Sequence, residues 1–276
     1  MPELPEVETV RCGLEQAVLG SRIESVKINR YDLRVAVPQD FGQSVGGKVI
    51  ESLTRRGKYI VMHLSGDICV VLHLGMSGRV RIFEKGNPYE ARKHDHLIFY
   101  VGDDVCFAFE DPRRFGMVYI SEEHNWQNEP PFSKMGPEPL DIWTGKDLFD
   151  ALRGKRVNIK SALLDQRIVS GLGNIYVCEA LYNAGVHPER PSGSIKRAEA
   201  DAIVACSRDV LEKAIAAGGS TLKDYQKTDG SLGYFQYQFA VYDQEGEACS
   251  NSKCTTTILR IVQSGRSTFY CPTCQK

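Results

Sequence analysis

Residues 1–20 read MPELPEVETVRCGLEQAVLG, and this stretch determines how the fold begins. Its apolar residues recur every three or four positions, which predicts an amphipathic helix over residues 5–19 with proline in its first turn. Removal of Met1 would expose the secondary amine of Pro2, a nucleophile that can form an iminium with an electrophilic carbon. The carboxylates of Glu3 and Glu6 stand beside Pro2 in the sequence. Many chains begin Met-Pro, so this start alone does not distinguish a reactive centre from an ordinary N-terminus.

The next hundred residues are rich in short apolar or alternating runs bounded by Gly, Asp or Pro. That density of short runs is typical of an antiparallel β-sandwich. The predicted strands are residues 23–28, 48–54, 59–64, 68–74, 79–83, 96–101, 105–110 and 116–120.

Helical periodicity replaces the strand pattern after a proline-rich linker at residues 122–142. Residues 218–239 have little periodicity and predict a loop, and we expect strand character to return from residue 239. The chain is therefore predicted to be an α+β protein. Its later helices are predicted at residues 144–152, 160–165, 175–184 and 195–217.

Composition limits the classes of protein that need to be considered. The 276 residues, 42% of them hydrophobic and 25% charged, fit two modest globular domains or one large domain with an appendage. No apolar run approaches the length of a membrane span. The first twenty residues hold four glutamates and no basic leader, which argues against a signal peptide and favours the cytoplasm.

Charge is unevenly distributed although the net charge is only -1. Residues 55–93 hold eight Lys or Arg against three acidic residues, and residues 250–276 hold four against none. A chain that is neutral overall can still present a basic face to phosphates.

Four of the nine cysteines gather at the end of the chain, as Cys249-x4-Cys254 and Cys271-x2-Cys274. Two close pairs separated by sixteen residues are typical of a structural tetrahedral zinc site. The insert is long enough for a β-hairpin with Arg266 at its turn. A redox role for the second pair alone would leave the first pair unexplained.

Five motifs together carry a resemblance to a known family. They are residues 1–9 (MPELPEVET), 73–78 (HLGMSG), 111–116 (DPRRFG), 171–176 (GLGNIY) and 266–272 (RSTFYCP). In this order they closely resemble bacterial formamidopyrimidine-DNA glycosylase, the base-excision enzyme for 8-oxoguanine and ring-opened purines. One departure is the first cysteine pair, which has four intervening residues where the family usually has two.

The resemblance implies four parts: a catalytic β-sandwich domain at residues 1–132, a linker at 133–150, a helix–two-turns–helix domain at 151–238 and a zinc finger at 239–276. It implies one structural Zn²⁺ and a monomer that acts on double-stranded DNA containing an oxidised purine, held in a cleft between the domains, with no membrane association. The activity expected is that of a bifunctional glycosylase and AP lyase, with β,δ-elimination following Schiff-base formation.

Site residues follow from the same resemblance. Pro2 is the expected nucleophile, Glu3 the acid/base, Lys58 a phosphate contact that also favours the neutral amine, and Glu6 a supporting group. Filling the gap left by the extruded base is assigned to Met76, Arg113 and Phe115. Phosphate contacts are assigned to His73, Lys160, Asn174 and Arg266, and lesion recognition to a loop that includes Ser220, Thr221 and Tyr234.

Two other interpretations are compatible with parts of the sequence. An endonuclease VIII-like glycosylase for oxidised pyrimidines shares the Pro-Glu start, the helical domain and a zinc finger. A zinc-containing DNA-binding protein without catalysis would not require Pro2, Glu3 and Lys58 together. The pair His94 and His96 has no third ligand in view, so we interpret both residues as structural.

Overall fold

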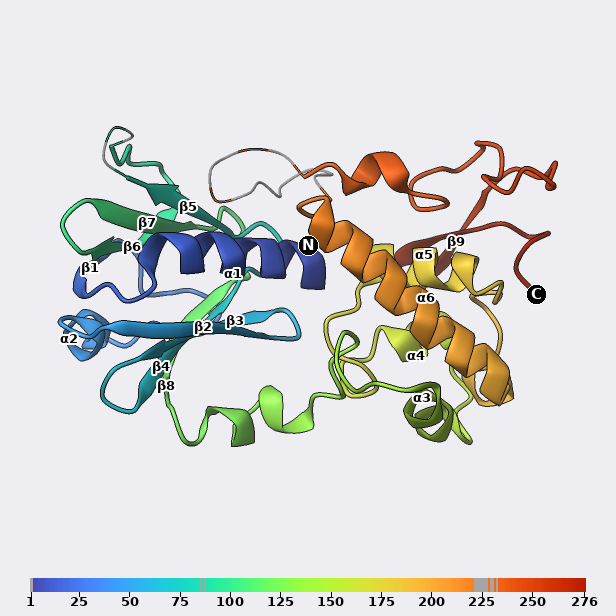
Figure 1. Cartoon of the computed structure of the whole chain (residues 1–276), viewed down its shortest axis with the longest axis horizontal. Helices are drawn as coiled ribbons and strands as arrows, with labels where there is room; N and C mark the ends of the chain where they lie inside the picture. The colour runs from blue at the N-terminus through green and yellow to red at the C-terminus, as the bar shows by residue number, and fades with distance from the viewer. Residues whose placement is uncertain (1, 85, 87, 221–227, 229–230, 232) are drawn as a thin grey trace. The chain divides into compact units, whose positions relative to one another are not determined.

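The computed structural model describes residues 2–84, 86, 88–220, 228, 231 and 233–276. The chain divides into two compact units. Figure 1 is coloured by residue number, so the segments of each unit can be found in it. The first comprises Met1–Ser133 and Ala217–Tyr234, and the second comprises Lys134–Ala216 and Phe235–Lys276. Among the described residues, none of the helices combines the length and apolar character needed to cross a bilayer.

The first unit is a β-sandwich preceded by a helix, α1 (Leu4–Val18). Its two four-stranded sheets are antiparallel, in the orders β1-β6-β7-β5 and β2-β3-β4-β8. The strands are β1 (Ile23–Ile28), β2 (Ile50–Arg56), β3 (Tyr59–Leu64), β4 (Ile68–His73), β5 (Arg79–Phe83), β6 (Asp95–Val101), β7 (Val105–Glu110) and β8 (Met117–Glu122).

The core of this unit contains side chains from both sheets and from the apolar face of α1. Val7, Val10 and Leu14 of the helix are almost completely buried there, and Phe99 stacks on Phe107 with ring centroids 4.5 Å apart. Burial of each large apolar side chain stabilises the fold by roughly 1.5–3 kcal/mol. Figure 1 shows α1 running alongside both sheets, so the core fixes the position of the chain start.

The predicted sandwich is confirmed, with differences at its margins. The second strand was expected at residues 48–54 but lies at Ile50–Arg56, because Arg56 still pairs with Tyr59 across the following turn. A short helix, α2 (Phe41–Val45), was missed because five residues are too few to show a helical period. The predicted linker contains two 3-10 turns, η1 (Trp126–Asn128) and η2 (Phe132–Lys134).

The second unit is built on helices, with α6 packed against α3 and α5. Side chains cap two of its helices: Thr144 accepts a bond from the Asp147 amide, and Asn158 accepts one from the Ser161 amide. Its elements are α3 (Gly145–Leu152), α4 (Ile159–Leu163), α5 (Asn174–Asn183), η3 (Ser192–Ser194), α6 (Arg197–Ala216) and η4 (Phe235–Gln238).

The unit ends in the predicted hairpin, β9 (Leu259–Gln263) paired with β10 (Arg266–Tyr270). Ser264 and Gly265 between them both have positive φ, as a two-residue turn of type I′ requires. The expectation of strand character from residue 239 was wrong, because strands begin only at Leu259. The backbone amides of residues 240–242 bond instead to the buried carboxylate of Glu179, which removes them from any sheet.

Candidate active site

The first turn of α1 concentrates buried polar groups. Pro2, Glu3 and Glu6 are all buried, and Glu3 is the N-cap residue of the helix. Glu6 accepts a hydrogen bond from the Glu3 amide on Oε2, at 2.9 Å, and one from the Ser220 amide on Oε1, at 2.8 Å. One carboxylate therefore fixes the backbone at both Glu3 and Ser220.

Lys58 lies in the tight turn between β2 and β3 and is 8% exposed. Gly57 before it has φ of 59°, which favours glycine. Arg55 fastens this turn to α1, because its guanidinium donates to the Gly57 carbonyl at 3.0 Å and to Glu8 at 2.9 Å. Burial opposes ionisation of Glu8, yet Arg11 and Arg55 hold the pKa of this carboxyl below its ordinary value.

His73 is held as a neutral imidazole. Burial, followed by the positive charges of Lys58 and Arg34, lowers the pKa of His73 to about 4. Its Nδ1 accepts a hydrogen bond from the Gly75 amide at 3.1 Å, and its ring packs on Tyr59 with centroids 4.4 Å apart. Because Nδ1 is the acceptor, the proton of the neutral ring is on Nε2, which is left as a donor.

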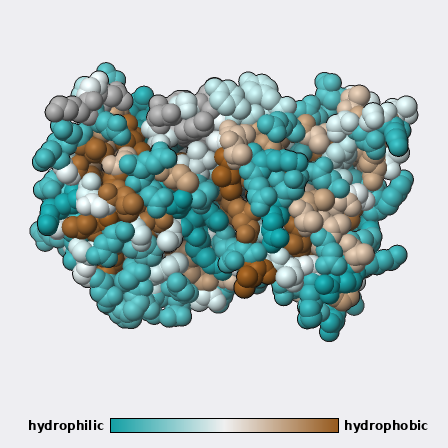
Figure 2. Space-filling model, in the orientation of Figure 1, coloured by the Kyte–Doolittle hydropathy of each residue, from teal (hydrophilic) through white to brown (hydrophobic). Residues whose placement is uncertain are grey.

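Two loops carry the residues assigned to gap filling: the β4–β5 loop (74–78) and the β7–β8 loop (111–116). Met76 is half-buried, whereas Arg113 and Phe115 are exposed. The Arg113 guanidinium lies over the Phe115 ring, 5.3 Å from its centroid. Figure 2 shows a face on which hydrophilic atoms predominate, with several hydrophobic patches between them. Phe115, at 44% exposure, is one of the exposed large apolar side chains among the described residues.

Three residues assigned to phosphate contacts meet in the second unit. The Ser267 carbonyl accepts hydrogen bonds from Asn174 Nδ2 at 2.9 Å and from Lys160 Nζ at 3.0 Å. Ser267 is the residue directly after Arg266, the third member of the set. Lys160 is fully buried and also bonds to Thr268 Oγ1 at 2.6 Å, whereas Arg266 is exposed at the start of β10. Of these three, Arg266 is therefore the side chain that the fold presents to solvent.

The loop residues are only partly described. Ser220 is buried and forms an antiparallel bridge with Tyr234, which is 58% exposed. Thr221 lies outside the described residues. His96 Nε2 donates a hydrogen bond to the Asp111 carbonyl at 2.7 Å, so its ring serves the fold of the first unit.

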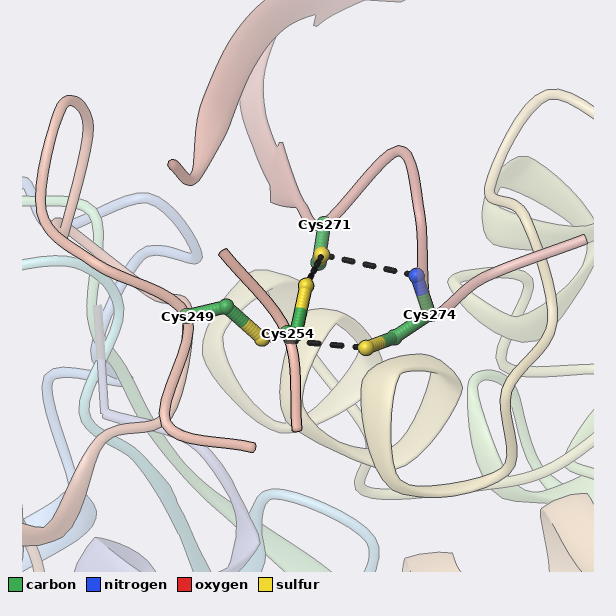
Figure 3. Close-up of side chains that lie close together, drawn as sticks. All are labelled: Cys249, Cys254, Cys271 and Cys274. Carbon is green, nitrogen blue, oxygen red and sulfur yellow. Dashed lines mark hydrogen bonds between the residues drawn. The ribbon is translucent and has the colours of Figure 1, made fainter. Parts of the chain in front are cut away.

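The four terminal cysteines converge on one point (Figure 3). Their sulfur atoms all lie within 4.8 Å of one another, with Cys249 and Cys274 3.8 Å apart and Cys254 and Cys271 3.7 Å apart. A tetrahedral zinc thiolate site with Zn–S bonds of ~2.3 Å has sulfur–sulfur edges of ~3.8 Å. The donor set therefore fits one structural Zn²⁺, and the longer first knuckle does not prevent it.

The zinc centre is supported from α5. The Tyr182 hydroxyl lies 3.1 Å from Cys249 Sγ, and apolar residues around Phe269 pack against the cysteines.

Sequence reasoning missed Glu179, whose carboxylate binds the backbone amides of residues 240–242, although a glutamate inside the apolar run of residues 175–181 was a signal for a buried, bonded carboxylate. It also assigned no role to Asp111, which is fully buried in the β7–β8 loop.

Three family profiles match successive parts of the chain. They are the formamidopyrimidine-DNA glycosylase N-terminal domain at residues 1–118, the formamidopyrimidine-DNA glycosylase H2TH domain at 135–226, and the zinc finger found in FPG and IleRS at 246–276. The order of the three profiles agrees with the order of the motifs in the sequence.

Relatives along the whole chain carry the same name. Formamidopyrimidine-DNA glycosylases from Ruegeria pomeroyi and Cereibacter sphaeroides are 47% and 48% identical, each alignment covering 100% of both chains. A complex of Lactococcus lactis Fpg with DNA containing an abasic site is similar with a TM-score of 0.89 and 34% identity over 100% of both chains. The Fpg protein of Thermus thermophilus gives 0.88 and 36%, covering 99% of this chain and 98% of that one.

Proposed function

Because the chain belongs to the formamidopyrimidine-DNA glycosylase family, we propose that it removes oxidised purines from DNA in base-excision repair and then cleaves the strand as an AP lyase. The observation that carries this proposal is the buried group at the start of α1, where Pro2 and Glu3 lie beside the doubly bonded Glu6. The proposed substrates are 8-oxoguanine and formamidopyrimidines in double-stranded DNA.

Pro2 supplies the nucleophile once Met1 has been removed. Its amine attacks C1′ of the damaged nucleotide, the glycosidic bond breaks, and the base leaves with a proton. Glu3 moves protons at the deoxyribose as the ring opens and the iminium forms. The iminium acidifies the adjacent carbon, so elimination breaks the 3′ phosphodiester and then the 5′ one. Lys58 contacts phosphate, and its positive charge favours the unprotonated amine.

Extrusion of the damaged nucleotide leaves a gap in the duplex and costs a few kilocalories of stacking. Phe115 provides a flat, exposed wedge, Met76 an unbranched adaptable filler, and Arg113 a donor for the base left without a partner. The exposure of Phe115, with the guanidinium of Arg113 over its ring, supports this assignment.

Phosphate contacts fall into two kinds. His73 offers a neutral Nε2–H donor, and Arg266 offers an exposed cation at the hairpin turn. Asn174 and Lys160 bond to the Ser267 carbonyl, so we infer that they hold the backbone beside Arg266 in place for such a contact. Binding should weaken as salt rises, because phosphate contacts release counterions.

The zinc ion is structural in this proposal: bound to the four thiolates, it stabilises the finger that carries Arg266. We also propose that the protein works as a cytoplasmic monomer, with a catalytic domain at residues 1–132, a linker at 133–150, a helix–two-turns–helix domain at 151–238 and a zinc finger at 239–276. The division of the chain near Ser133 supports the first of these boundaries, whereas the same division groups Ala217–Tyr234 with the first unit and not with the helices of the second.

Borohydride trapping tests the proposal directly. The purified protein is incubated with a duplex containing 8-oxoguanine opposite cytosine, and reduction should give a covalent protein–DNA adduct. Intact binding without an adduct would eliminate the Schiff-base mechanism. Faster cleavage of a dihydrouracil duplex than of the 8-oxoguanine duplex would instead favour an endonuclease VIII-like specificity for oxidised pyrimidines.

A further inference from the structure

One buried carboxylate bonds to both loops that carry the gap-filling residues. Asp111 is 0% exposed, and its two oxygens have different partners. Oδ1 accepts the Ser77 hydroxyl of the β4–β5 loop at 2.7 Å, and Oδ2 accepts the Gly116 amide of the β7–β8 loop at 2.7 Å. The Ser77 oxygen in turn accepts the Arg113 amide at 3.2 Å, which closes a hydrogen-bond network across the two loops.

The loops are also in close steric contact. Gly75 has φ of 61°, and a Cβ atom there would lie 2.5 Å from the Gly116 nitrogen, so only glycine fits. Asp111 itself is fixed to the neighbouring segment, because its amide bonds to the His94 carbonyl at 3.0 Å and its carbonyl to His96 Nε2 at 2.7 Å. The network therefore has an anchor outside both loops, at β6 and the residue before it.

The three gap-filling residues lie next to the atoms that this network holds. Met76 precedes Ser77, Phe115 precedes Gly116, and the amide of Arg113 is itself bonded to Ser77. A displacement of either loop would therefore alter how the three side chains are presented together.

We propose that Asp111 is a positioning residue, which acts through Ser77 and Gly116 to hold Met76, Arg113 and Phe115 as one rigid wedge for base extrusion. This inference rests on the proposed function. The carboxylate touches none of the reacting atoms in this scheme. Its effect is confined to steps that require a damaged nucleotide to be taken out of a duplex.

The test separates extrusion from chemistry by the choice of substrate. Excision of 8-oxoguanine from a duplex requires extrusion, whereas cleavage at an abasic site in single-stranded DNA requires only the amine and its acid/base groups. Ser77→Ala removes the hydroxyl that links Asp111 Oδ1 to the Arg113 amide. We expect single-turnover excision from the duplex to fall by about tenfold or more, while lyase cleavage of the single-stranded substrate stays within about twofold.

Ser121→Ala is the matched control. Ser121 is also a buried serine of the first unit whose hydroxyl donates to a carboxylate, Glu129 Oε2 at 2.9 Å, but it lies in β8 away from both loops. This variant should keep both activities. Asp111→Asn gives a second test, because its amide must turn a donor toward either Ser77 or Gly116; it should show the same split between the two substrates.

A further readout follows the extrusion step itself. With 2-aminopurine beside the lesion, the rise in fluorescence on unstacking should be smaller or slower for Ser77→Ala than for the wild-type protein. If Ser77→Ala lost both activities in parallel, the network would have only a general structural role. If duplex excision by Ser77→Ala were unchanged, the network would have no role in extrusion. Either result overturns the inference. A wild-type protein that gives no borohydride adduct would overturn the proposed function instead.

Discussion

The carboxylate of Glu6 and the amide of Ser220 are 2.8 Å apart, although 214 positions separate them in the sequence. The same carboxylate holds the Glu3 amide, so a single side chain connects the proposed acid/base residue with Ser220, a residue assigned to lesion recognition. The backbone positions of Glu3 and Ser220 are therefore expected to depend on one another.

Replacement of Glu6 by glutamine tests this dependence. The amide side chain can accept only one of the two bonds and turns a donor toward the other backbone N–H, so one buried amide loses its acceptor. We expect the rate of 8-oxoguanine excision under single-turnover conditions to fall by about ten- to a hundredfold. Glu15→Gln, which alters a more exposed carboxylate of the same helix paired with Arg11, should have little effect. An excision rate equal to that of Glu15→Gln would contradict the prediction.

The role of the Pro2 amine as the nucleophile can be tested by blocking that amine. A tag that stays attached ahead of Pro2 converts the amine to an amide, and the borohydride adduct should fall to background. Pro2→Gly keeps a free but primary amine, and we expect its lyase turnover to fall by about tenfold. Intact mass spectrometry establishes for each sample whether Met1 is present. Adduct formation by a protein whose tag is demonstrably retained would rule out this amine.

His73 should make stability depend on pH in a defined direction. Its pKa in the folded protein, about 4, is below the ordinary value, so the native state favours the neutral ring. The stability from this group is complete above the unfolded pKa of about 6.5 and is lost as pH falls from there toward 4. Between pH 8 and pH 5 the free energy of unfolding should fall by about 2 kcal/mol more in the wild type than in His73→Asn.

Denaturant unfolding at the two pH values measures this difference. His124→Asn is the control, because the His124 side chain is 65% exposed. If His73→Asn loses as much stability on acidification as the wild type does, the neutral form of His73 contributes nothing to the fold.

Removal of one zinc ligand should weaken DNA binding by the finger and leave the proposed catalytic residues at the start of α1 in place. Cys271→Ala should purify with much less than one zinc per chain and bind duplex DNA at least about tenfold more weakly, because the Arg266 hairpin loses its metal support. Metal analysis and a binding titration measure the two effects. Cys206→Ala removes a half-buried thiol of α6 and should retain both zinc and affinity. A zinc-free variant with normal affinity would show that the finger is dispensable for binding.

Local patterns were sufficient for much of this structure. The stripe of Val7, Val10 and Leu14 predicted α1, alternating runs predicted the sandwich, and the cysteine spacing predicted the zinc site with its hairpin. In each case, the signal lies in residues close together in sequence. The short helix α2 gave no such signal, and residues 240–242 form no strand because Glu179, far away in sequence, binds their backbone amides.

The sequence predicted which residue types belong to the site better than it predicted their contacts and protonation states. Lys160 carries a charge that suggested direct phosphate contact, yet the fold buries it against Ser267 and Thr268. The protonation and the tautomer of His73 depend on its burial and on the hydrogen bond from the Gly75 amide. Neither can be predicted from the spacing of residues in the sequence. Asp111 and Ser77 are 34 positions apart, so their bond becomes visible only in three dimensions.

The three amides that Glu179 binds have a consequence for how this chain tolerates changes in length. Residues inserted before Ala240 would bulge out as extra loop, because the carboxylate would still fix the chain at residues 240–242. Residues inserted after Tyr242 would shift the approach to Cys249 and disturb the metal. A scan of insertions across residues 236–247, read out as zinc per chain, should show tolerance that ends abruptly at this carboxylate.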